Sequence, residues 1–170
     1  MRTRRLVTTA ALTALYVVLG LFAAVNLGNM RLTFDALPII IGALLFGGMR
    51  GAAIGLCGGF LVQLLTYGLT PTTILWVLPA AARGLFVGCM RGYVLRDGRR
   101  LLPVIIASAF IVTALNTGVM ALDSIIYGYY SRAYVFGALI WRVAAGVLTS
   151  LVHAAVLPPV LARLLPLYTE

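Results

Sequence analysis

Two arginines lie inside otherwise apolar stretches of the sequence, where a cation is costly. Arg83 is in the middle of "ILWVLPAAARGLFVGC", residues 74–89, and Arg142 follows Trp141 in a second apolar stretch. If a helix starts near Thr72, Arg83 lies roughly 17 Å along it, near the middle of a bilayer. Insertion scales assign about 2.5–3.5 kcal/mol to an arginine at that depth. Such a cost suggests a specific use, because a guanidinium stays charged and its planar fork can hold two oxygen atoms.

Polar residues form a stripe on each of three predicted helices. Residues three or four positions apart share one face of a helix, and polar faces inside a membrane usually line a cavity or contact one another. The three stripes are Thr72, Trp76, Pro79 and Arg83; Thr113, Asn116, Met120 and Asp123; and Arg142, Gly146, Thr149 and His153.

A pocket is the first interpretation of these stripes. Arg83 would face the floor of an outward-facing site for a small, polar and anionic ligand. Arg142 and Asn116 would approach from two other helices, and Trp76 and Trp141 would stack on a flat ring. The spans contain no obvious buried carboxylate, which favours this interpretation because an unpaired cation requires an anion.

An internal network is the second interpretation, and the sequence leaves it open. Arg142 would then pair with Asp123, and Arg83 would bond to backbone carbonyl groups that Pro79 frees. His153 lies deep in its predicted helix and apart from other polar groups. We therefore interpret it as a hydrogen-bonded core histidine rather than a ligand of any kind.

No catalytic or metal-binding signature is present. The patterns HExxH and GxSxG, a phosphate-binding loop and paired carboxylates are all absent. Cys57 and Cys89 lack metal-ligand spacing, so we expect small buried apolar side chains. We expect no enzyme, no cofactor and no metal site, and no self-powered transport, since ion-coupled carriers commonly use a membrane carboxylate. The acidic residues lie in predicted loops, at boundaries or at the end: Asp35, Asp97, Asp123 and Glu170.

The composition indicates an integral membrane protein. Of 170 residues, 62% are hydrophobic and only 10% are charged, too few for the surface of a soluble domain. The net charge of +9 does not indicate nucleic-acid binding, because the arginines lie at the ends of apolar runs. We predict an all-α bundle, one domain over residues 1–170. Its six transmembrane spans are approximately 6–25, 36–49, 50–68, 72–94, 101–122 and 134–157.

Arginine counts predict the orientation of this bundle. Cytoplasmic segments of membrane proteins carry an excess of basic residues. With the N-terminus inside, only Arg31 and Arg132 lie outside, and both termini are cytoplasmic. Pro158 and Pro159 should end the sixth span, because neither donates a backbone hydrogen bond. The cytoplasmic arginines would be Arg2, Arg4, Arg5, Arg50, Arg91, Arg96, Arg99, Arg100 and Arg163.

The outer segments provide further candidate binding residues. Loops outside a rigid helical scaffold can open and close over a site, so residues 26–36 and 67–72 are expected to cover the ligand. Tyr129, Tyr130 and Tyr134 are more typical of an interfacial aromatic belt. The candidates from these segments are Asn29, Arg31, Phe34, Thr70, Thr72 and Tyr127.

Small residues recur at four-residue spacing on two predicted helices. Such stripes let helix backbones approach closely in lipid. Gly51, Gly55 and Gly59 are expected to pack within the chain. Ala10 and Ala14 occupy the same spacing in the first span, where contact with a partner protein is the alternative.

The chain resembles the substrate-binding S components of energy-coupling factor (ECF) vitamin transporters over its whole length. The resemblance rests on the six predicted spans and "AALTA" at residues 10–14. It also rests on "RLTFDALPIIIGALLFGGMRGAAIG", in which a polar loop and a proline lead into a Gly-Ala hairpin. The segments "ALNTGVMALDSIIYG" and "IWRVAAGVLTSLVHAAVLPPVLARL" are most similar to folate-binding members.

This resemblance implies a function and its partners. An S component captures a vitamin from outside, then docks on a transmembrane T component driven by two ATPase subunits. It would reside in a prokaryotic plasma membrane. Ala10 and Ala14 would be the docking stripe, and folate, or another anionic vitamin, the ligand. A solitary vitamin carrier and a six-span scaffold of the cell envelope are the alternatives.

Overall fold

A computed structural model describes residues 2–27 and 30–169 of the chain. The fold is all-α, as predicted, apart from one short hairpin of strands. Its main apolar helices are α1 (Arg2–Phe22), α2 (Ala36–Phe46), α3 (Gly48–Tyr67), α4 (Thr73–Cys89), α6 (Leu101–Ile126) and α8 (Leu139–Leu164). Shorter elements connect them: β1 (Ala24–Leu27), β2 (Met30–Thr33), α5 (Arg91–Arg96), η1 (Gly98–Arg100), α7 (Arg132–Phe136) and α9 (Pro166–Thr169).

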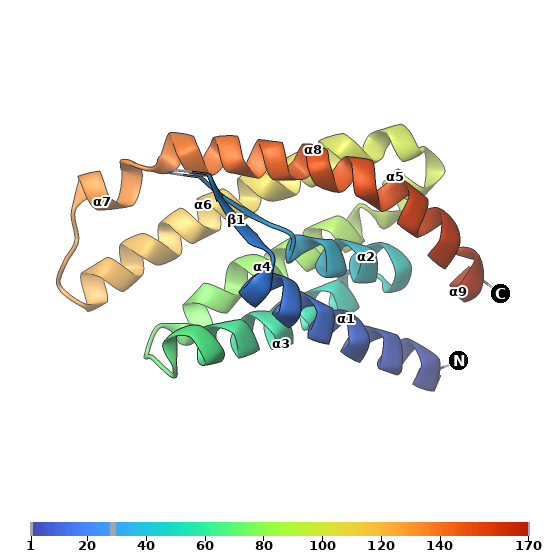
Figure 1. Cartoon of the computed structure of the whole chain (residues 1–170), viewed down its shortest axis with the longest axis horizontal. Coiled ribbons are helices and arrows are strands. Elements are labelled where there is room, and N and C mark those ends of the chain that lie inside the picture. Colours follow the sequence, from blue (N-terminus) through green and yellow to red (C-terminus); the bar gives the residue numbers. More distant parts are fainter. Residues whose placement is uncertain (1, 28–29, 170) are drawn as a thin grey trace.

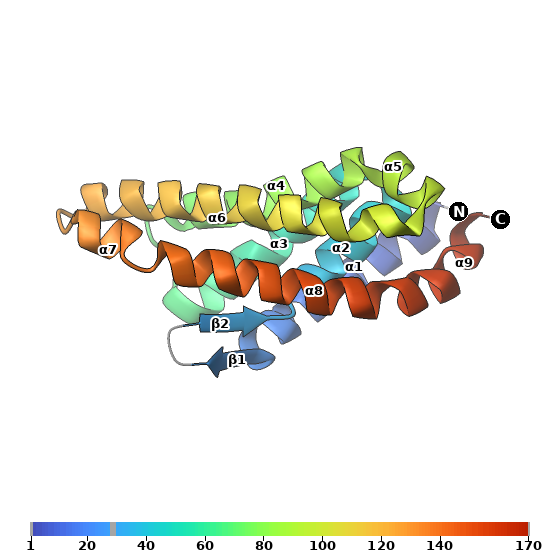
Figure 2. The same ribbon diagram turned by 90° about the horizontal axis from the view of Figure 1, so that it is seen from above.

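The long helices lie side by side along the longest axis of the molecule, and both ends of the chain lie at the same end of the bundle (Figure 1 and Figure 2). Four helical segments of the described chain are long and apolar enough to cross a membrane. They are Thr3–Phe22, Gly48–Tyr67, Gly98–Ile126 and Arg132–Leu164. The length and composition of these helices are those of a membrane protein. The count of six spans stays a prediction.

The helix α2 forms the centre of the apolar core. Its 11 residues extend only about 16 Å, well short of the hydrocarbon thickness of a bilayer. Ile39, Ile40 and Leu44 are at most 1% exposed. A helix that is apolar on all sides is buried on all sides, and α2 contacts α1, α3, α4 and α8. The segment predicted as the second span is therefore a short, buried helix around which longer helices pack.

Glycines let α3 approach its neighbours closely. Gly47 joins α2 to α3 with a φ of 92°, a left-handed conformation that favours glycine. A Cβ atom on Gly55 would lie 2.5 Å from the carbonyl oxygen of Ala80 in α4. One on Gly51 would lie 2.6 Å from the Cβ atom of Ala43 in α2. The predicted hairpin of α2 and α3 and the predicted packing of the glycine stripe are both confirmed.

A β-hairpin, which the sequence analysis did not anticipate, occupies the first connection. β1 and β2 pair antiparallel, with Ala24 opposite Thr33 and Asn26 opposite Arg31. The strand β2 contacts α8. The candidate Asn29 lies outside the described residues, and Arg31 is placed only by its backbone.

Two predictions about local structure were wrong. The helix α8 continues through Pro158 and Pro159 to Leu164. Membrane helices tolerate such prolines where neighbouring groups satisfy the freed backbone. Cys57 and Cys89 are exposed rather than buried, because their apolar helices also present apolar faces outward. In addition, the predicted fourth span divides at Met90 into α4 and α5, and α7 precedes α8 as a separate helix.

Basic residues at the end of the bundle that holds both termini are held by carbonyl groups and aromatic rings. Arg91 donates from Nε to the carbonyl oxygen of Leu44 at 2.7 Å. The Arg100 guanidinium lies 4.3 Å from the ring centre of Tyr93. Arg4 lies 5.0 Å from the ring centre of Tyr168. These contacts tie α5 and the last helix to the rest of the bundle.

Candidate functional site

A cavity of about 520 Å³ lies within the bundle. Pockets for small organic ligands typically measure ~300–1,000 Å³ and combine apolar walls with a few polar groups. Side chains from α1, α2, α3, α4, α6 and α8, and from the end of the hairpin, line the cavity. Its polar and aromatic lining residues are Tyr16, Thr33, Asp35, Gln63, Tyr67, Trp76, Arg83, Ser108, Thr113, Asn116, Trp141, Arg142, Thr149, Ser150 and His153.

The helical repeat explains why α4, α6 and α8 contribute most of this polarity. Trp76, Pro79 and Arg83 follow one another at three- and four-residue spacing on α4 and all face the cavity. Thr113 and Asn116 face it from α6, as two positions of the stripe predicted there. The α8 lining contains all four residues of its predicted stripe: Arg142, Gly146, Thr149 and His153.

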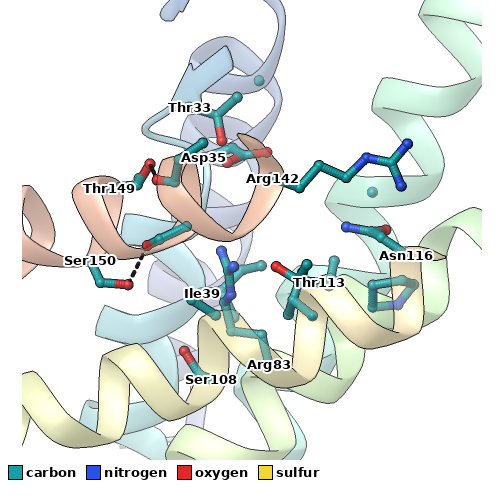
Figure 3. Close-up of a pocket in the computed structure, with 18 of the residues that line it drawn as sticks. Thr33, Asp35, Ile39, Arg83, Ser108, Thr113, Asn116, Arg142, Thr149 and Ser150 are labelled. Carbon is teal, nitrogen blue, oxygen red and sulfur yellow. Dashed lines mark hydrogen bonds between the residues drawn. The ribbon is translucent and has the colours of Figure 1, made fainter. Parts of the chain in front are cut away.

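Arg83 has no hydrogen-bond or ion-pair partner among the described residues. Its Nε atom is buried, and Asp35 and Tyr16 interact with the guanidinium electrostatically. In Figure 3 the side chain extends into the middle of the lining residues, with Thr33 and Asp35 beyond its guanidinium end. The expected bonds to carbonyl groups freed by Pro79 are not formed, because the side chain extends into the cavity instead.

Arg142 is held differently from Arg83. Its Nη1 atom lies 3.4 Å from the carbonyl oxygen of Val135, and its Nη2 atom lies 2.7 Å from the sulfur of Met120. The expected pair with Asp123 is not formed, since that carboxylate accepts hydrogen bonds from neutral groups. These weak acceptors leave the Arg142 cation uncompensated by any carboxylate in the described part of the chain.

Asp123 accepts hydrogen bonds from two aromatic side chains at the far end of α6. Trp76 donates from Nε1 to Oδ1 at 3.2 Å, and the Tyr129 hydroxyl donates to Oδ2. The same bond raises the pKa of Tyr129 above its ordinary value, because the carboxylate holds the proton on the phenol. The cavity wall at Trp76 is thereby connected to the segment that follows α6.

Three of the hydroxyl groups in the cavity donate to their own helix. Ser108 donates to the carbonyl oxygen of Ile105 at 2.7 Å. Ser150 and Thr149 donate at 2.6 Å to carbonyl oxygens one turn earlier in α8. By contrast, Asn116 and Gln63 have no side-chain hydrogen bond to any described residue. The groups free to bind a ligand therefore include these two amides, the Arg83 guanidinium and the Nε2 atom of His153.

The sequence-based candidates divide into two groups. Five line the cavity: Trp76, Arg83, Asn116, Trp141 and Arg142. Four other described candidates do not line it: Phe34, Thr70, Thr72 and Tyr127.

The four candidates outside the lining have local roles. Thr70 is hydrogen-bonded to Thr73 at the start of α4, and Thr72 is fully buried there. Phe34 contacts the His153 ring edge-on, at 6.4 Å between ring centres. Tyr127 stacks on Tyr129 at the end of α6.

His153 is buried as expected and has a hydrogen bond to the backbone of Thr33, but only part of its hydrogen-bonding capacity is satisfied. It is 2% exposed, it lines the cavity, and its Nε2 atom has no partner among the described residues. Sequence reasoning also missed Tyr16, Asp35 and Gln63. Of these, Gln63 had a usable signal, since it is the one polar side chain between Gly51 and Leu65 of α3.

Ala10 and Ala14 are exposed on α1. Neither faces the cavity or the core cluster. The spacing of the two residues places them on one face of the helix. A small-residue stripe on an outer face is therefore present, and its partner stays a prediction.

Comparisons with known proteins agree with this architecture. A family model described as the S component of an ECF-type riboflavin transporter matches residues 1–165. A solved structure of the S component of a bacterial ECF transporter superposes with a TM-score of 0.69 at 17% sequence identity. The match covers 96% of this chain and 99% of that chain, and it shows a shared fold. No curated protein matches the sequence.

Proposed function

We propose that this chain, which belongs to the family of ECF-type riboflavin transporter S components, binds a flavin vitamin in the cavity around Arg83. Members of this family are membrane-embedded vitamin-binding subunits rather than enzymes, and they work with a T component and ATPase subunits. The proposal concerns the identity of the vitamin, the residues that hold it and the direction of its capture.

The unpartnered Arg83 guanidinium is the observation that carries the proposal. A buried cation without hydrogen bonds is costly, so a ligand that supplies acceptors gains the full benefit of the contact. The isoalloxazine ring of riboflavin presents a carbonyl oxygen beside a ring nitrogen, and a guanidinium fork can donate to both atoms. Arginine recognises the same arrangement of acceptors on guanine.

The walls of the cavity suit the remainder of riboflavin. Trp76 and Trp141 offer flat rings against which a tricyclic ring can stack. Asn116 and Gln63 retain free amide groups, and the ribityl chain carries hydroxyl groups that both donate and accept. Asp35 offsets part of the charge of Arg83, which favours a neutral ligand over a strongly anionic one.

An anionic vitamin such as folate is the second candidate. The cavity lining contains two arginines and one carboxylate, so its charge is net positive. Carboxylates bind guanidinium groups through two parallel hydrogen bonds. The net positive charge of the lining supports the expected anionic ligand, whereas membership of the riboflavin transporter family supports riboflavin.

The charge distribution supports the proposed orientation in the membrane, with the cavity open to the outside. Arg91, Arg99 and Arg100 lie near the end that holds both termini (Figure 1), and basic segments favour the cytoplasmic side. The opposite end, with the β-hairpin nearer to it, would then face outward in a prokaryotic plasma membrane. We propose six spans, with α2 reaching only part of the depth. Ala10 and Ala14 would dock on the T component.

The two alternatives, a scaffold and a solitary carrier, differ from the proposed function in what they require of the cavity and of vitamin uptake. A scaffold has no need to bring Trp76, Arg83 and Asn116 into one cavity, which is where they lie. A solitary carrier would still take up vitamin in cells without the T component and ATPases, whereas the proposed subunit would not.

Equilibrium titration of the detergent-solubilised protein tests the vitamin. Riboflavin should quench the fluorescence of the two tryptophans and saturate, and excess folate should not displace it. Saturable folate binding that riboflavin fails to displace would replace the flavin with the second candidate. Binding of neither would remove the proposed function.

A further inference from the structure

Asp123 is a buried carboxylate whose partners are all neutral. It is 8% exposed and forms no ion pair with any described residue. Its oxygens accept from the indole nitrogen of Trp76 at 3.2 Å and from the hydroxyl of Tyr129, and Thr72 adds a third side-chain hydrogen bond. The partners come from α4 and from the segment after α6, so one carboxylate connects three parts of the fold.

An ionised group in this place is an expensive means of holding helices together. Burying a carboxylate costs free energy, and three hydrogen bonds from neutral donors have to be arranged around this one to offset that cost. An apolar residue at position 123 would pack the same helices without that cost. The carboxylate therefore indicates that the fold needs a strong hydrogen-bond acceptor at this position, and that one of the donors bonded to it has to be held in place.

The donor that matters for the cavity is Trp76. Its ring lines the cavity, while its nitrogen is bonded to Asp123 outside the lining set. An indole at the wall of a cavity can rotate about two side-chain torsions unless another group holds it. Fixing the nitrogen fixes the plane of the ring, which is what a stacking partner requires.

We propose that Asp123 is a positioning residue for vitamin binding: it fixes the plane of the Trp76 ring in the wall of the cavity. This inference rests on the proposed function, because the ring is useful there only if a flat ligand stacks on it. Tyr129 takes the second oxygen and holds the carboxylate in place. Its ring also contacts Tyr127, stacked at 6.4 Å, and Tyr134, edge-on at 5.4 Å.

A riboflavin titration of four proteins tests the inference: wild type, Asp123→Leu, Trp76→Phe and the double variant. Asp123→Leu should weaken binding about tenfold, as expected for the loss of one hydrogen bond to a charged group. In the Trp76→Phe background the same change should have no further effect, because Phe has no nitrogen to hold. Asp123→Asn keeps an acceptor oxygen and should restore most of the affinity.

Additive losses in the double variant would overturn the inference, since they would mean that Asp123 acts on the vitamin without Trp76. A lower melting temperature of Asp123→Leu with unchanged riboflavin affinity would also overturn it, because Asp123 would then be only a structural residue. If Asp123→Leu fails to fold, Tyr129→Phe carries the same comparison, because it frees the second oxygen of the carboxylate and so loosens the hold on Trp76.

A measurement without vitamin separates this inference from the proposed function. The chain has two tryptophans, so Trp141→Phe leaves Trp76 as the sole fluorophore. In that background Asp123→Leu should lower the fluorescence anisotropy of Trp76 as the ring gains freedom. Unchanged anisotropy would contradict the positioning role even if riboflavin binds. A changed anisotropy in a protein that binds no riboflavin would preserve the role and remove the flavin.

Discussion

Replacing Arg83 with methionine separates a binding role from a structural one. The guanidinium has no hydrogen bond to a described residue, and its Nε atom is buried. Methionine is unbranched and uncharged and reaches as far as the position of Nε, so it keeps the apolar part of the side chain and removes the burial cost of the cation. We expect Arg83→Met to insert and fold as well as wild type or better.

The expected loss of affinity follows from the contacts that Arg83 offers. One hydrogen bond to a charged group contributes ~1.5–3 kcal/mol, so its loss weakens binding about tenfold to hundredfold. Arg83→Lys keeps the charge but loses the planar fork, and it should also bind more weakly than wild type. Riboflavin titration and a thermal melt of the same preparations measure both quantities.

Arg91→Met is the matched control. Arg91 lies outside the cavity lining, and its Nε atom donates to the carbonyl oxygen of Leu44 at 2.7 Å. Removing this side chain should lower the melting temperature and leave riboflavin affinity unchanged. If Arg83→Met instead melts early and binds normally, Arg83 is a structural residue and the reasoning is wrong.

Three further predictions concern the docking face, the hairpin and the helix packing. Ala10→Trp with Ala14→Trp should abolish uptake by the complete transporter while riboflavin binding persists, because added volume keeps helices apart; unchanged uptake would exclude this docking face. Riboflavin at saturation should slow proteolysis within residues 24–33 if the hairpin covers the site, and equal cleavage rates would show that it does not. Gly55→Ala should destabilise the protein by ~1–3 kcal/mol, since its Cβ atom would lie 2.5 Å from a carbonyl oxygen of α4. Gly118→Ala, with nothing within 4 Å, should be neutral or slightly stabilising in the same melt.

The polar lining of the three helices was predictable because it depends on local geometry. Helical spacing alone places Trp76 and Arg83 on one face of α4, and Arg142 and His153 on one face of α8. The cost of a membrane arginine then indicates that such a face points inward. This inference needs only the 3.6-residue repeat of the α-helix and the free-energy cost of a charged side chain in lipid.

The rest of the site could not be read from the sequence, because it depends on how distant elements meet. Asp35 reaches the cavity only because the β-hairpin folds against α8 and delivers the chain to α2. Tyr16 is in an apolar helix in which several faces are equally apolar. Hydropathy does not distinguish a residue that faces lipid from one that faces protein, which is why Cys57 and Cys89 were misplaced. For the same reason, the sequence did not show that α2 is only 11 residues long and buried by its neighbours.

Mass spectrometry of the small molecules that copurify with the solubilised protein tests the central claim most directly. Riboflavin should accompany the wild-type protein, be strongly depleted in Arg83→Met and be retained in Arg91→Met. A pterin, or a flavin retained equally by all three proteins, would contradict it.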